Sequence, residues 1–132
     1  MYYLLKTEPF EYSYEDLRRE GKTKWDGVKN PLAQKYIASM KEGDVCFIYH
    51  TGNIKAVVGL AEVISKPYKD KNGLWVVDIR ATERLKRYVF LRDIKECAEF
   101  KESPLTKIPR LSVVPLTQNQ AERILKLSEH VE

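Results

Sequence analysis

The spacing of apolar residues along the chain predicts a protein built mainly from short strands. In residues 75–85 the apolar residues Trp75, Val77 and Ile79 recur at every second position, which is typical of a strand with one buried face. Apolar runs between turn-forming residues predict further strands at 2–6, 44–50, 55–64, 88–90 and 111–114. The polar segments 22–30 and 67–73 are rich in turn formers, so both are expected to be loops.

Capping residues predict where the helices begin and end. Ser13 followed by Asp16 resembles a capping box, so a short helix is expected to start there and to stop at Gly21. Asn30 directly before Pro31 is a strong helix start, and this helix is expected to end near residue 40 or 41. Two further helical segments are expected, at 91–96 and after the capping pair Thr117 and Gln120.

Several short, mostly antiparallel strands with few helices indicate the α+β class. In 132 residues, which fit a single domain, the expected architecture is a small mixed or antiparallel β-barrel flanked by short helices. Closing the sheet into a barrel would remove the exposed edges that an open sheet has to protect.

Composition narrows the class of protein. The chain is 43% hydrophobic, which is enough for one core, and no apolar run approaches the about 20 residues that span a bilayer. The first residues show no signal-peptide pattern, and the two separate cysteines fit a reducing cytoplasm better than a disulfide. Two histidines, His50 and His130, match no metal motif, so no metal or other cofactor is expected.

The formal net charge of +4 favours a polyanionic partner. Basic residues cluster at 66–71, 84–87 and 101–110, with Tyr68, Trp75 and Tyr88 between them. This pattern fits a surface that follows phosphates, and it equally fits ordinary solvated loops.

Two windows of the sequence contain residues that could bind a base or a phosphate. Trp25, Asp26 and Asn30 could offer a stacking face, a hydrogen-bond acceptor for an exocyclic amino group and an amide. Alternatively, Trp25 anchors the end of the barrel and Asn30 only caps a helix. Lys6 could meet a phosphate at a strand end, with Tyr12 and Ser13 as pocket walls, or these residues form an ordinary strand end and helix cap.

The sequence shows no clear motif of a catalytic site. His50 could be a general base, but no nucleophile motif accompanies it, and a histidine that closes a strand is more often structural. The carboxylates near strand ends show no paired spacing, and there is no glycine-rich phosphate loop.

Five segments of the chain resemble the EVE domain family. They are, in order, KTEPFEYSYEDL, WDGVKNPLAQKYIASMKEGDVCFIYHT, VVGLAEV, WVVDI and RLSVVPLT. The matches run from Lys6 to about Thr117 and are highly specific in combination. The family belongs to the PUA-like superfamily and is similar to the YTH readers of methylated adenine in RNA.

The resemblance implies a PUA-like barrel with a pocket for one base, often a modified one. The pocket residues that it implies are Trp25, Asp26, Asn30, Tyr12, Ser13, Leu111 and Ser112, and the phosphate-binding residues are Lys6, Lys29 and Arg110. The family usually has arginine where this chain has Lys29, so the charge is kept but the planar bidentate fork is lost.

The sequence therefore predicts a binding module that takes one flipped-out base of DNA or RNA into an aromatic pocket. The expected partner carries a modified cytosine or adenine. The alternatives are an enzyme acting on a nucleobase or nucleoside, with Asp26 or His50 as general base, and a non-specific RNA-binding subunit of a larger complex.

Overall fold

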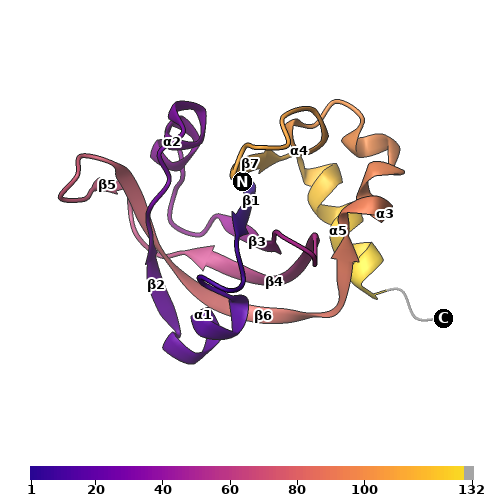
Figure 1. Cartoon of the computed structure of the whole chain (residues 1–132), viewed down its shortest axis with the longest axis horizontal. Coiled ribbons are helices and arrows are strands. Elements are labelled where there is room, and N and C mark those ends of the chain that lie inside the picture. Colours follow the sequence, from indigo (N-terminus) through magenta and orange to yellow (C-terminus); the bar gives the residue numbers. More distant parts are fainter. Residues whose placement is uncertain (130–132) are drawn as a thin grey trace.

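The computed structural model describes residues 1–129, which form a seven-stranded mixed sheet flanked by short helices (Figure 1). The strands are β1 Tyr2–Thr7, β2 Lys22–Trp25, β3 Val45–His50, β4 Ala56–Val63, β5 Tyr68–Lys69, β6 Trp75–Phe90 and β7 Val113–Leu116. Their order in the sheet is β2-β6-β4-β3-β1-β7, with β5 paired to β6. Strands β1 and β3 are parallel, and the other pairs are antiparallel. The predicted α+β class is confirmed.

Strand β2 corrects the expectation that residues 22–30 form a loop throughout. Its four residues pair with β6, from Lys22 opposite Arg80 to Trp25 opposite Val77. Only Trp25 is buried, while Lys22 and Lys24 are exposed, as is common for a short strand at a sheet edge. The segment is therefore polar because it forms an exposed edge strand, and not because it lacks regular structure. Similarly, the expected loop 67–73 contains the two-residue strand β5.

Strand β6 is one continuous strand, where two separate strands were predicted at 75–85 and 88–90. It pairs with β2 and β5 near its start and with β4 along most of its length. Register shifts near Gly59 and Leu60 of β4 let the pairing continue past the polar residues in the middle of β6. The strand thereby bends around the molecule (Figure 1).

The helices follow the predicted caps closely. They are α1 Tyr14–Glu20, α2 Pro31–Ala38, α3 Leu91–Lys95, the 3₁₀ helix η1 Ala98–Phe100, α4 Pro104–Lys107 and α5 Gln118–Glu129. The reciprocal bonds between Ser13 and Asp16 confirm the capping box, and Thr117 and Gln120 make the same pair of bonds before α5. Helix α2 ends at Ala38, earlier than residue 40, because Ser39 N–H and Met40 N–H bond three residues back and tighten the last turn.

The strands β2 and β7 stand at the two ends of the sheet order. Strand β2 lies at one end, β7 lies at the other beside β1, and no hydrogen-bonded strand pair joins β2 to β7 within residues 1–129. Buried side chains of the central strands, such as Leu4, Phe47 and Val77, form the core. Thr23, Lys24 and Trp25 of β2 and Ser112, directly before β7, line the same cavity.

None of the helices found between residues 1 and 129 combines the length and apolar character needed to cross a membrane. His130, which matches no metal motif in the sequence, lies outside the described residues.

Candidate functional site

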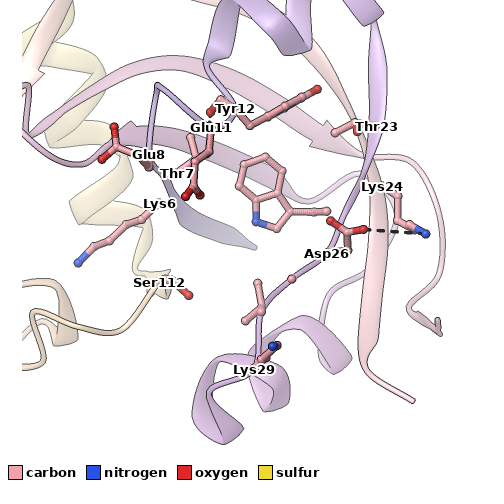
Figure 2. Close-up of a pocket in the computed structure, with 13 residues that line it drawn as sticks. Lys6, Thr7, Glu8, Glu11, Tyr12, Thr23, Lys24, Asp26, Lys29 and Ser112 are labelled. Atoms are coloured by element: carbon pink, nitrogen blue, oxygen red, sulfur yellow. Dashed lines mark hydrogen bonds and ion pairs between the residues drawn. The ribbon is translucent and has the colours of Figure 1, made fainter. Parts of the chain in front are cut away.

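A cavity of about 470 Å³ opens between β2 and the start of the β1–α1 connection (Figure 2). This volume falls within the range of about 300–1,000 Å³ that is usual for small-ligand sites. The cavity is lined by Lys6, Thr7, Glu8, Glu11, Tyr12, Thr23, Lys24, Trp25, Asp26, Gly27, Val28, Lys29 and Ser112. Residues from both windows singled out in the sequence, 6–13 and 25–30, thus meet at one site although they come from different parts of the sheet, but Ser13 and Asn30 are not among them.

Two aromatic residues form the deep wall of the cavity. Trp25 is only 8% exposed, and its ring meets Tyr12 edge to face with the centroids 6.2 Å apart. The Tyr12 hydroxyl donates to Glu20 Oε1 at 2.5 Å. Burial, together with this bond, raises the pKa of Tyr12 to about 12, so the hydroxyl remains a proton donor at neutral pH. Trp25 is therefore an anchor in the core, as one of the two alternatives expected, and it also lines the cavity.

Asp26 supplies the exposed acceptor of the site. Its side chain is 54% exposed, and its Oδ2 lies 3.9 Å from Lys24 Nζ (Figure 2). An exposed ion pair of this length contributes little to stability, so both carboxylate oxygens remain available to a ligand. Gly27, which follows, has φ of 77°, a conformation that glycine adopts without strain.

The basic residues of the site differ in how firmly they are held. Lys6 donates from Nζ to the Pro109 carbonyl at 2.8 Å, and the same Nζ lies 5.7 Å from the centre of the Tyr49 ring. Burial lowers the pKa of Lys6. Lys29 lines the cavity and is exposed. Ser112 lines the cavity as well, and its carbonyl accepts a hydrogen bond from Lys6 N–H at 2.9 Å.

Four of the residues implied by the family resemblance are not part of the cavity lining. The Ser13 and Asn30 side chains accept hydrogen bonds from the first turns of α1 and α2, so both act as helix caps. Leu111 is buried in the core, and Arg110 is exposed. The structure brings together the remaining six: Lys6, Tyr12, Trp25, Asp26, Lys29 and Ser112.

Sequence reasoning missed several lining residues, above all Glu8 and Glu11. Glu8 lies within the window from Lys6 to Ser13, but the sequence assigned it no role in a pocket. Pro9 marks a turn in the sequence, but it does not indicate which of the flanking side chains face a ligand. The lining holds three cations, Lys6, Lys24 and Lys29, against the three anions Glu8, Glu11 and Asp26, so the formal charges cancel.

His50, the candidate general base, is a structural residue. It is 6% exposed, and its Nε2 accepts the N–H of Tyr14 at 3.0 Å, which ties the start of α1 to the end of β3. It does not belong to the cavity lining.

Metal-binding chemistry has no support in the part of the chain that the structure describes. Residues 1–129 contain no group of three or more histidine, cysteine, aspartate or glutamate residues able to hold an ion. Cys46 is a buried free thiol, and Cys97 is a partly exposed one. The side chains that line the cavity can stack against a ring, accept and donate hydrogen bonds, and pair with charged groups of a ligand.

Comparison with known proteins agrees with this fold. The EVE domain family matches residues 1–127, and the chain belongs to this family. A protein from Rhodopseudomonas palustris, solved by NMR, is 34% identical with a TM-score of 0.91, and the match covers 99% of this chain and 94% of that one. Thymocyte nuclear protein 1 of Rattus norvegicus is 31% identical over 97% of this chain and 74% of its own length.

The fold is shared with a structure that contains DNA. The human THYN1 protein was crystallised in complex with DNA containing 5-methylcytosine, and its chain has a TM-score of 0.84 at 24% identity, covering 99% of both chains.

Proposed function

We propose that this protein binds DNA that carries 5-methylcytosine and takes the modified base, flipped out of the helix, into the cavity between Tyr12 and Lys29. The observation that carries the proposal is the combination of a Trp25–Tyr12 aromatic wall with the open carboxylate of Asp26 in one cavity. The human THYN1 complex supports the choice of 5-methylcytosine in DNA, since that protein shares the fold.

Different lining residues bind different parts of the nucleotide. The aromatic wall contacts the π-face and the methyl group of the base. Asp26 accepts a hydrogen bond from the exocyclic amino group, and Lys29, with Ser112, meets the sugar–phosphate backbone at the mouth. Asn30 contributes indirectly, because it caps α2 and thereby fixes the position of Lys29. Flipping costs a few kcal/mol, and these contacts have to offset that cost.

A binding role is favoured over catalysis by the composition of the lining. Its 13 residues include no histidine or cysteine, so the lining lacks the commonest general base and a thiol nucleophile, and Ser112 has no histidine in the lining to activate it. RNA carrying a modified base is the competing ligand and is one arm of the test.

The test is a fluorescence anisotropy titration with matched duplexes that contain cytosine or 5-methylcytosine at one position, together with the same sequence as single-stranded DNA and as RNA. One buried methyl group contributes about 0.8 kcal/mol, so roughly fourfold preference for the methylated duplex is expected. Asp26→Ala is expected to weaken binding of the methylated duplex by roughly tenfold to a hundredfold, since it removes a hydrogen bond to a charged acceptor.

Asp93→Ala is the matched control, because Asp93 is an exposed aspartate on α3 that lines a different depression of the surface. Its affinity is expected to equal that of the unmodified protein. Equal affinity for both duplexes, or equal losses in the two aspartate variants, would contradict the proposal. Tighter binding of the RNA than of the DNA would mean that the partner is RNA.

A further inference from the structure

Phe10 is the most exposed large hydrophobic residue within 1–129. Its side chain is 97% exposed, whereas the next such residue, Met1 at the chain start, is 69% exposed and the others reach at most 43%. Single exposed apolar residues are common on protein surfaces, so exposure alone is no evidence of function. The position of Phe10 relative to the cavity is what makes its exposure informative.

The turn that carries Phe10 is firmly held. The N–H groups of Glu11 and Tyr12 both donate to the Glu8 carbonyl at 2.9 Å, and the Thr7 hydroxyl donates to the Tyr12 carbonyl at 2.7 Å. The carboxylate of Glu8 accepts from Phe10 N–H at 3.3 Å and from the Thr51 hydroxyl at 3.4 Å. Phe10 is therefore presented to solvent by an ordered support, and its exposure does not follow from a loosely held loop.

The same turn forms the rim of the cavity. Glu8, Glu11 and Tyr12 lie along one side of it, and Lys29 lies across from them (Figure 2). Phe10 stands between Glu8 and Glu11 in the chain but is not itself part of the lining. The two carboxylates disfavour a phosphate at this rim, so a nucleic acid has to present its bases here and its backbone on the side of Lys29.

We propose that Phe10 is a wedge that enters the base stack of the duplex at the place vacated by the base held in the cavity. A flipped base leaves its neighbours unstacked, and an apolar side chain inserted at such a step restores part of the lost contact. The inference rests on the proposed function, since a wedge is needed only if a base leaves the stack. It assigns to Phe10 the role of lowering the cost of flipping, separate from reading the base.

The test compares a duplex with an isolated nucleotide. Phe10→Ser is expected to weaken binding of the 5-methylcytosine duplex by roughly fivefold to a hundredfold, the range for loss of one base–aromatic stack. Binding of 5-methyl-2′-deoxycytidine monophosphate, followed by NMR titration at millimolar concentration, is expected to stay unchanged because no stack has to be opened. Phe10→Trp is expected to restore duplex affinity, since it keeps a stacking face.

Tyr88→Ser is the matched control, because Tyr88 is a 41% exposed aromatic residue on β6 that lines another depression. It is expected to bind the duplex as the unmodified protein does. The wedge is refuted if Phe10→Ser binds the duplex normally, if it loses nucleotide affinity to the same extent, or if Phe10→Trp fails to restore binding. Failure of the proposed function has a different signature, namely no preference of the unmodified protein for the methylated duplex.

Discussion

At the scale of single residues, several side chains near the cavity have structural as well as candidate binding roles. Trp25 packs in the core and also lines the cavity, so its replacement would change stability and binding together. Asp26 has only a weak ion pair, and Phe10 has almost no packing to lose. Asp26 and Phe10 are therefore the residues whose substitution separates function from folding.

His50 makes the stability of the protein depend on pH. Its ring is buried, and burial lowers the His50 pKa from the usual 6.5, with Glu8 acting in the opposite direction. Its Nε2 can accept the Tyr14 N–H only while it is unprotonated. The unfolded chain therefore takes up this proton more readily than the folded one. The stability due to neutral His50 is fully present above pH 6.5 and is lost as the pH falls through the lowered native value.

His50→Gln is expected to remove this dependence, because a glutamine oxygen can accept the same N–H without titrating. In urea unfolding at pH values from 8 to 5, the unmodified protein should lose stability below pH 6.5 more steeply than the variant, by at most about 1.4 kcal/mol per pH unit. Parallel profiles for the two proteins would contradict this account of His50.

At the scale of elements, the approach of α1 to β4 depends on a glycine. A Cβ on Gly59 would lie 2.3 Å from Tyr14 Cζ, and the Tyr14 hydroxyl donates to the neighbouring Leu60 carbonyl at 2.7 Å. Helix α1 can therefore rest on the sheet only where β4 has no side chain. Since the turn with Phe10 and Tyr12 leads directly into α1, this contact also fixes one rim of the cavity.

Gly59→Ala is expected to destabilise the protein by about 1–3 kcal/mol through overpacking against the Tyr14 ring. The free energy of unfolding from urea titration measures this cost. In a Tyr14→Ala background the same substitution is expected to cost much less, because the ring that it would meet is gone. An equal cost in both backgrounds would place its origin in the β4 backbone and contradict the packing argument.

Local signals in the sequence predicted the elements well where a capping residue marks their start. The capping pair of Ser13 with Asp16 and the Asn30-Pro31 start both specify hydrogen bonds within a few residues. Strand β2 was missed because its pairing partner, β6, lies more than 50 residues further along the chain. For the same reason, the parallel pairing of β1 with β3 could not be inferred from either segment alone.

The candidate site was predicted in part. Six of the ten residues implied by the family resemblance line the cavity, and two of the other four, Ser13 and Asn30, cap helices instead. A serine or asparagine at a helix start has the same sequence signal whether its oxygen faces the backbone or a ligand. Glu8 and Glu11 were missed because a turn has no periodicity that indicates which side chains face inward.

At the scale of the whole molecule, the charges of the cavity cancel although the chain carries a net charge of +4. The excess positive charge therefore lies outside the cavity and can attract DNA without selecting a base. Selectivity has to come from the cavity itself, through its aromatic wall and Asp26.

The most direct test is the NMR response of the two tryptophan indole N–H groups of the ¹⁵N-labelled protein to duplexes containing cytosine or 5-methylcytosine. Trp25 lines the cavity, whereas Trp75 lies at the start of β6 with Lys69 over its ring and serves as an internal control. If the modified base enters the cavity, the Trp25 signal shifts saturably and by more with the methylated duplex, while the Trp75 signal changes little. Equal Trp25 shifts with both duplexes, or larger shifts at Trp75 than at Trp25, would contradict the proposed function.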